Sequence, residues 1–460
     1  MGVTEELMKF VSEVKFEDLP APVVAEAKRH LLEGVCTITF GSGLRLGGSI
    51  CEALHREGEP QEAVFIGTDK KGSLRTAGMY NATMGDMQDS CGGYYYGVVH
   101  PAKNVTPAAL TYASAKGKSG KDLIVAMIMG IEAYARIDLA IAGAHTWRGH
   151  YNDGTIGCLG AAIAVGKLAG LPKDGLRSAL GNAGMLTPAT IGGNSMYKAI
   201  GRATALGMGA ANGIFAVELA QAGVSGPPDI LECPGGFSQA LSGVTDLSKV
   251  VQGLGREWES LKFYYKPFCG CRLTHSGRQC AQAFKKQTGV RPEDIDKVIW
   301  RMPAGNLIVT DHYPALGAPV SEHSSSAPYL IANVFLYDDV GPGCFSEKRL
   351  NDPKVHEMAG RVAVVADPEL TRAAEGGYDK SYRTRIEIFT RDGNKYAYSA
   401  EHVKGDPYGE WRMTDDELKD KFRTYCAGVL SPDRVEDALE MITRLDEVDV
   451  AKLVGLLSTG

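Results

Sequence analysis

The stretch GTIGCLGAAIAVGKLAG, residues 154–170, is rich in glycine and alanine and carries one charged residue, Lys167. A second stretch, residues 202–222, has a similar composition. Side chains this small allow neighbouring helices to approach closely, because the distance between helix axes depends on the residues at the contact. We therefore predict that this part of the chain forms a compact, internally packed helical domain.

Helical patterns dominate the sequence up to about residue 260. Ser119 and Asp122 have the spacing of a capping box and precede a long apolar run, residues 123–142. The segment GMGAANG, residues 207–213, superficially resembles a dinucleotide-binding loop. Its glycine spacing is wrong and no strand pattern precedes it, so we interpret it as a site of close helix packing.

The pattern changes after about residue 290, where strand-like segments become frequent. Alternating or β-rich segments occur at residues 297–302, 361–366, 383–393 and 394–400. The turn residues RDGN at 391–394 join the last two segments and indicate a β-hairpin. The tail returns to helix, with a capping box at Thr414 and Glu417 and a helix start at Ser431-Pro432.

These patterns predict a mainly α fold, with a large all-helical domain and a smaller α+β lid domain inserted into it. The helical domain is predicted to be discontinuous, comprising residues 1–268 and 403–460, and the lid domain to comprise residues 269–402. Clefts between domains are favoured ligand sites, so we expect the functional site near the junction of the two domains.

Charge and composition narrow the classes of partner. The 460 residues carry a net charge of −6, which gives no support to a nucleic-acid or acidic-membrane partner. The N-terminus lacks the basic and apolar regions of a secretory signal, and the longest strongly apolar run, residues 123–131, is too short to span a bilayer. The ten cysteines include no CxxC pair, so we expect a reducing, cytoplasmic location.

One short segment gathers cations in this acidic chain. FYYKPFCGCRLTH, residues 263–275, contains Lys266, Arg272 and His275 together with two cysteines. A zinc site, a thiol nucleophile and a pocket for a multiply charged anion are the three candidate interpretations. The cysteines are separated by one residue, a spacing that fits neither a zinc knuckle nor a redox dithiol.

Three further segments carry side chains suited to chemistry. They are residues 84–104 with Asp86, Asp89 and His100, residues 145–155 with His145 and His150, and residues 192–203 with Lys198 and Arg202. Each alone is explained as readily by a structural role, as capping carboxylates, an exposed loop or a solvated helix face. The two histidines of the second segment lack a set of carboxylate partners, so we predict no metal site.

The ordered set of these segments resembles the MmgE/PrpD family, which includes 2-methylcitrate dehydratase, cis-aconitate decarboxylase and iminodisuccinate epimerase. The resemblance covers nearly the whole chain. The motifs that carry it are residues 86–90 followed by His100-Pro101, His150 before GCLGAAIAVGKLAGL at 157–171, Lys198 after a glycine-rich turn, GVSGPPDILECPGGF at 223–237, KPFCGCRLTH at 266–275, and GDP at 405–407 with MTDDELKDKF at 413–422.

The resemblance implies a homodimer and a reaction without metal or cofactor on a small di- or tricarboxylate. Carried over by position, the active-site residues are Asp86, Ser90, His100, His150, Lys198, Lys266 and Cys271, with His275 adjacent. We predict catalytic roles for Asp86, His100, His150, Lys198, Lys266 and His275, and substrate binding by Ser90, Arg202, Cys271 and Arg272. Two positions depart from the family pattern: Cys271 stands where cis-aconitate decarboxylase has a histidine, and Ser90 replaces a threonine.

The family reactions involve, or are closely related to, a carbanion-like centre next to a carboxylate. Cations are then needed where negative charge develops on the enediolate oxygens, and Lys198, Lys266 and Arg272 suit that role. An anion pocket therefore explains the cations of residues 263–275, whereas the zinc interpretation lacks ligands and this chemistry needs no nucleophile. Nearby cations are expected to lower the pKa of Cys271, which we interpret first as a wall of the pocket.

We predict a lyase that dehydrates a 2-methylcitrate-like hydroxy acid. In this hypothesis His150 is the base and His100, held by Asp86, protonates the leaving hydroxyl, although the exchanged roles fit the sequence equally well. Alternatives are an epimerase or isomerase of an iminodisuccinate-like dicarboxylate, a cis-aconitate-type decarboxylase, and a catalytically idle family member that serves as a structural or binding dimer. The tyrosines at 94–96 are candidates for lining the pocket.

Overall fold

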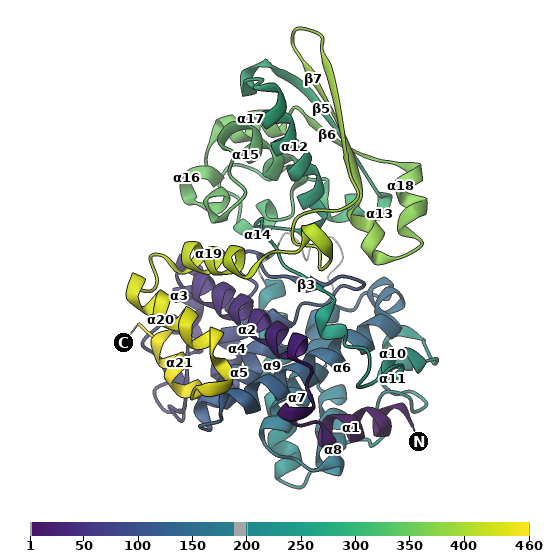
Figure 1. Ribbon diagram of the computed structural model, residues 1–460, viewed down its shortest axis with the longest axis vertical. Helices are drawn as coiled ribbons and strands as arrows, with labels where there is room; N and C mark the ends of the chain where they lie inside the picture. Colours follow the sequence, from purple (N-terminus) through teal and green to yellow (C-terminus); the bar gives the residue numbers. More distant parts are fainter. Residues whose placement is uncertain (1, 188–198, 200, 460) are drawn as a thin grey trace.

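The computed structural model describes residues 2–187, 199 and 201–459, and it has the predicted fold class, mainly α with a smaller α+β portion (Figure 1). Helices fill one part of the molecule, and a four-stranded sheet with its own helices occupies the other. The helices of the first part are α1 (Val3–Glu13), α2 (Ala21–Ser42), α3 (Arg45–Leu54), α4 (Leu74–Met84), α5 (Val105–Ala115), α6 (Gly120–Trp147), α7 (Asn152–Leu168), α8 (Lys173–Met185), α9 (Gly201–Gln221), α10 (Phe237–Ser242) and α11 (Ser248–Val251).

The glycine- and alanine-rich stretch forms α7, which lies at the centre of the helical part. It packs against α5, α6, α8 and α9. A Cβ atom on Gly213 of α9 would come within 2.9 Å of the Cys158 carbonyl oxygen, and one on Gly160 within 2.8 Å of a Val105 methyl group. These contacts are too short for a real Cβ atom, so glycine is required where the helices touch. The predicted close packing, including that of residues 207–213, is confirmed.

Helix α9 also has the composition of a membrane span. Among the described residues it is the one helix long and apolar enough, by length and composition, to cross a bilayer. However, 56% of its apolar window is buried inside the protein, where α9 packs against α4, α7 and α8. A core helix of a folded domain passes the same composition test, so this burial accounts for its apolar character.

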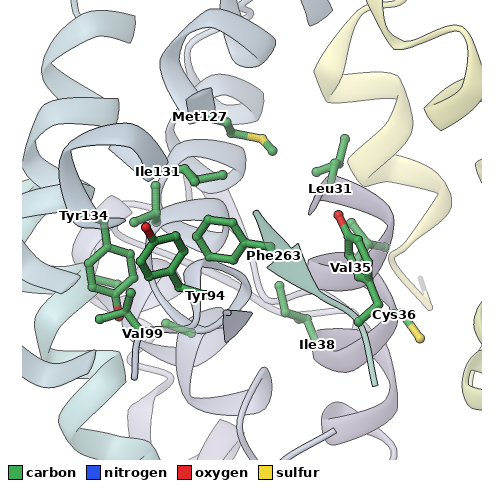
Figure 2. Packing of buried hydrophobic residues seen from close by; sticks show 14 of the residues in the cluster. Leu31, Val35, Cys36, Ile38, Tyr94, Val99, Met127, Ile131, Tyr134 and Phe263 are labelled. Atoms are coloured by element: carbon green, nitrogen blue, oxygen red, sulfur yellow. The ribbon is translucent and has the colours of Figure 1, made fainter. Parts of the chain in front are cut away.

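The apolar core extends from α2 to α6 and encloses two short strands. Figure 2 shows Leu31 and Val35 of α2 on one side and Met127 of α6 on the other. Phe263 lies next to Tyr94, with ring centroids 5.3 Å apart, and Tyr94 lies beside Ile131 and Tyr134 of α6. Tyr94 and Phe263 belong to β3 (Gly93–Tyr94) and β4 (Phe263–Tyr264), which pair in antiparallel register. The core therefore ties residues near 94 to residues near 263.

The α+β part contains the strands predicted after residue 290. The sheet order is β6-β5-β7-β8, with β5 parallel to β6 and antiparallel to β7. The turn at 391–394 joins β7 to β8, with Gly393 at φ 87°, so the predicted hairpin is confirmed. The strands are β5 (Ile295–Met302), β6 (Val362–Ala366), β7 (Thr384–Thr390) and β8 (Lys395–Ala400), and the helices are α12 (His275–Thr288), α13 (Ala304–Thr310), α14 (Val320–His323), α15 (Ala327–Tyr337), α16 (Glu347–Leu350), α17 (Pro353–Ala359) and α18 (Pro368–Ala374).

The C-terminal helices return to the helical part of the molecule. They are α19 (Asp415–Cys426), α20 (Pro432–Thr443) and α21 (Val450–Leu456). Helix α19 packs against α2 and α21 against α5, and Figure 1 shows all three, in yellow, beside these purple and blue helices. This arrangement agrees with a discontinuous helical domain, while its boundaries at residues 268 and 403 stay a prediction.

The capping box at the start of α6 yields a prediction about stability. Ser119 Oγ accepts a hydrogen bond from the Asp122 amide at 3.2 Å, and Asp122 Oδ2 accepts one from the Ser119 amide at 3.1 Å. Ser119→Ala is expected to lower the free energy of unfolding by about 1 kcal/mol, because it removes the acceptor for an otherwise unpaired helix amide. Urea denaturation measures this. Ser49→Ala, an exposed change inside α3, is the matched control, and equal losses in both variants would contradict the prediction.

Candidate active site

A cluster of buried charges forms the centre of the candidate site. Lys103 Nζ lies 2.6 Å from Asp86 Oδ1 and 3.0 Å from Asp89 Oδ1. Lys266 Nζ lies 2.9 Å from the same oxygen of Asp89. Arg202 Nη2, at the start of α9, is 3.5 Å from Asp86 Oδ2. The structure thus brings together Asp86, Lys266 and Arg202, three of the predicted site residues from distant parts of the chain.

The local backbone explains how these charges meet. Asp86 follows the end of α4, and Lys103 ends the short helix η2 (Pro101–Lys103). Asp89 has a left-handed conformation, φ 51°, which aspartate tolerates better than most residues. Lys266 donates to the Asp89 carbonyl at 2.8 Å. Because Lys266 lies two residues after the end of β4 and β4 pairs with β3, this small ladder holds the aspartate-rich loop against residues 263–266.

The ion pairs keep the cluster charged despite its burial. Burial opposes ionisation of Asp89, but the charges of Lys103 and Lys266 outweigh it and hold the pKa of that carboxyl well below its usual range. Burial likewise opposes the charge of Lys103, yet Asp86 and Asp89 hold its pKa well above the usual value. Buried charges are tolerated when they are paired in this way. Asp89 and Lys103 are therefore both ionised at neutral pH.

His100 lies beside the cluster and is held by a second carboxylate. Its Nδ1 is 2.9 Å from Asp153 Oδ2, and its backbone amide donates to Asp153 Oδ1 at 2.8 Å. The hydroxyl of Tyr134, on α6, also donates to Asp153 Oδ1. The prediction that Asp86 holds His100 is therefore wrong. Asp86 faces Lys103, and Asp153 in the first turn of α7 is the partner of the histidine.

The surroundings of His100 define its protonation. Burial and the positive charge of Lys103 lower its pKa, although Asp153 opposes them. The pKa of Asp153 itself lies below its usual value because the attraction of His100 and Lys103 overcomes the effect of burial. Since an ionised carboxylate only accepts, Nδ1 carries the proton and Nε2 has an unprotonated lone pair that can accept a hydrogen bond. Nε2 lies 3.2 Å from the Tyr264 hydroxyl, which donates to it.

Arg272 and His275 lie in different surroundings from Lys266. The guanidinium of Arg272 pairs with Asp406 and donates to the Lys404 carbonyl at 3.4 Å. His275, at the start of α12, has Nε2 3.3 Å from the Gly270 carbonyl, and burial together with Arg272 holds its pKa well below the usual value. Of the three cations predicted to face one anion, Lys266 is the member in direct contact with the described cluster.

Cys271 and Ser90 are buried residues near the charged cluster. Burial raises the pKa of Cys271 to about 11, with Asp89 adding to this effect and Lys266 opposing it. The predicted lowering of that pKa is therefore wrong, because desolvation of the thiolate outweighs the nearby cations. Ser90 Oγ donates to the Gln88 carbonyl at 3.3 Å. Both side chains are buried and are suited to walls rather than to acid-base roles.

The remaining candidates from the sequence are His150, Lys198 and the tyrosines at 94–96. His150 lies between α6 and α7, and its ring contacts that of His145, with centroids 5.2 Å apart. Within the described part of the chain, no hydrogen bond or ion pair joins His150 to the charged cluster. Lys198 lies outside the described residues. Tyr94 points into the core and donates to Glu259, whereas Tyr95 packs with Tyr264 and Tyr382.

Sequence reasoning missed Lys103, Asp153 and Tyr264, which the structure places in the candidate site. All three lie inside segments that the sequence analysis singled out. Their signal was weak, because a lysine after proline and an aspartate in the first turn of a helix are ordinary surface features. As for metals, no group of three or more His, Cys, Asp and Glu side chains is arranged to hold an ion among residues 2–187, 199 and 201–459.

The mainly helical fold and a half-buried histidine, paired with a buried carboxylate beside buried lysines, form a candidate acid-base site of the kind found in enzymes. The family model for the MmgE/PrpD N-terminal domain matches residues 5–249, and that for the MmgE/PrpD C-terminal domain matches residues 268–447. The chain therefore belongs to the MmgE/PrpD family, as predicted.

Curated relatives align over almost their full length. The chain is 25% identical to cis-aconitate decarboxylase of Aspergillus terreus, with 99% of this chain and 96% of that protein covered. It is 24% identical to cis-aconitate decarboxylase of Homo sapiens, with 100% and 95% covered, and 22% identical to that of Mus musculus, with 100% and 94% covered. These similarities support the predicted lyase class.

Proposed function

We propose that this protein is a lyase that dehydrates a small hydroxy di- or tricarboxylate of the 2-methylcitrate type by removing a proton alpha to a carboxylate. The observation that carries this proposal is the neutral His100, fixed by Asp153, next to the buried ammonium groups of Lys103 and Lys266. The arrangement supplies a base and cations at one place, which is what formation of an enediolate requires.

The cations address the main energetic difficulty of the reaction. Removing the alpha proton places additional negative charge on the substrate carboxylate, and preorganised donors aimed at that charge contribute about 3–4 kcal/mol each. Each ammonium group has three donors. Lys103 and Lys266 therefore retain the capacity to bind a substrate carboxylate while they remain paired with Asp89.

His100 is the better candidate for the base. A base must hold an unprotonated lone pair at the working pH, and the Nε2 atom of a neutral His100 does so. The hydrogen bond to Asp153 also stabilises the imidazolium that forms when the proton is taken. The sequence fitted either histidine as the base, and this assignment gives that role to His100. His150 is then not required as the base.

Decarboxylation is the second candidate, because the relatives that align over almost the whole chain are named cis-aconitate decarboxylases. That reaction has to deliver a proton to a carbon atom of the substrate as CO₂ leaves. A neutral imidazole held by a carboxylate is better prepared to accept a proton than to donate one. A neutral His100 suited to removing an alpha proton therefore favours dehydration, and the names of the relatives favour decarboxylation.

Incubation with 2-methylcitrate in D₂O separates these reactions. The expected result is a new double-bond absorbance, with deuterium at the alpha carbon of recovered substrate where the enediolate returns to it. Deuterium uptake without any double-bond product would instead identify an epimerase or isomerase. Release of CO₂ from cis-aconitate, without dehydration of 2-methylcitrate, would identify a decarboxylase and contradict the proposal.

A further inference from the structure

Tyr264 has its hydroxyl within hydrogen-bond distance of His100 Nε2, the atom proposed to take the proton. Its hydroxyl oxygen lies 3.2 Å from Nε2, and the two rings meet edge to face with centroids 6.4 Å apart. Tyr264 is the second residue of β4, two positions before Lys266, so the strand pairing that positions the lysine also positions this hydroxyl. Asp153, His100 and Tyr264 thus form one continuous hydrogen-bonded chain.

The other side of Tyr264 faces a buried cation. The Arg272 guanidinium carbon lies 4.7 Å from the centre of the Tyr264 ring and 5.2 Å from that of Tyr382. Burial raises the pKa of Tyr264 well above its ordinary value, with Tyr378 and Asp89 adding to this effect and Arg272 and Lys103 opposing it. The hydroxyl is therefore protonated at rest, and the positive charges of Arg272 and Lys103 would stabilise a short-lived phenolate.

We propose that Tyr264 is the general acid of this site and donates its hydroxyl proton to the departing hydroxyl group of the substrate. This inference rests on the proposed dehydration. An elimination needs an acid for the leaving group as well as a base for the carbon. The sequence supplied only histidines for both roles, whereas the structure places a phenol next to the base.

The protons of this mechanism balance within the chain. His100 Nε2 takes the proton from the alpha carbon, and the electron pair of that C–H bond forms the enediolate and then the C=C bond. The C–O bond breaks as Tyr264 gives its proton to the leaving oxygen, which departs as water. The proton on His100 Nε2 then passes to the Tyr264 phenolate, which restores both groups to their starting states.

The first test separates proton removal from water loss. Tyr264→Phe is expected to slow water loss from 2-methylcitrate by about 10²-fold or more, while deuterium exchange at the alpha carbon in D₂O continues because His100 is intact. The matched control is Tyr382→Phe, which makes the same change in the same aromatic cluster, in a hydroxyl without a hydrogen-bond partner in the described residues. Equal losses of exchange and elimination in Tyr264→Phe, or unchanged rates of both, would overturn the inference.

A second test does not depend on turnover. The Tyr264 hydroxyl donates to the neutral form of His100, so its removal is expected to raise the pKa of His100 by about 0.4–1 unit. NMR titration of the labelled histidine ring measures this. The other charged groups that face His100, which are Asp153, Lys103, Lys266 and Asp89, remain in the variant. An unmoved titration contradicts the inference, whereas a wild-type protein that neither exchanges nor dehydrates 2-methylcitrate contradicts the proposed function.

Discussion

Replacing His100 with asparagine is expected to lower kcat for 2-methylcitrate dehydration by about 10²–10⁴-fold, the usual contribution of a positioned base. Asparagine keeps a polar side chain beside Asp153 but cannot accept the alpha proton. The backbone amide of His100 and the Tyr134 hydroxyl still bind Asp153 in the variant, so the fold is expected to survive. Steady-state rates and the deuterium exchange of recovered substrate, which should both fall, measure the effect.

His150→Asn is the informative comparison for that experiment. The His150 ring contacts His145 rather than the charged cluster, so a smaller loss is expected when it is replaced. If His150→Asn abolishes alpha-proton exchange and His100→Asn does not, then His150 is the base and the assignment made here is wrong. Thermal melting of both variants separates loss of chemistry from loss of folding.

The features that could be predicted from the sequence are those encoded locally. The spacing of Ser119 and Asp122 defines the start of α6 through contacts between residues three positions apart, and the RDGN turn defines a hairpin in the same way. The small residues of α7 predicted close packing because their size is itself the physical cause. Such signals involve residues close together in the sequence, so they can be interpreted without knowing which residues pack against them in the folded protein.

The partners within the site were not predictable in this way. Asp153 binds His100 across 53 positions in the sequence, and Asp86, only 14 positions from His100, was the natural but wrong choice. Lys103 is buried because Asp86 and Asp89 converge on it, whereas an isolated lysine is almost always exposed. The balance of burial against nearby charge, which raises the pKa of Cys271, likewise requires the three-dimensional arrangement.

The buried charges also make the site a sensitive point for stability. Lys103→Met is expected to lower the free energy of unfolding at neutral pH by about 3–5 kcal/mol, because it leaves buried carboxylates with too few cations. Among the described residues, Asp89 would keep Lys266, and Asp86 would keep the 3.5 Å contact with Arg202. Chemical denaturation measures the loss. Lys28→Met, which breaks a partly exposed pair with Asp446, is the matched control, with an expected loss of about 0–1 kcal/mol.

The pH dependence of the stability difference between the wild type and Lys103→Met tests whether unpaired charge causes it. In the wild type, the lowered pKa of Asp89 contributes stability that is present above the unfolded-state pKa and is lost as the pH falls toward the folded-state pKa. In Lys103→Met, an unpaired carboxylate has a raised pKa, so acidification protonates it and relieves the buried charge. Both effects reduce the difference in free energy of unfolding between the wild type and Lys103→Met at acidic pH. Adding Asp86→Asn to Lys103→Met should recover part of the stability that is lost at neutral pH. A difference in free energy of unfolding that stays constant with pH would mean that lost packing, rather than unpaired charge, destabilises Lys103→Met.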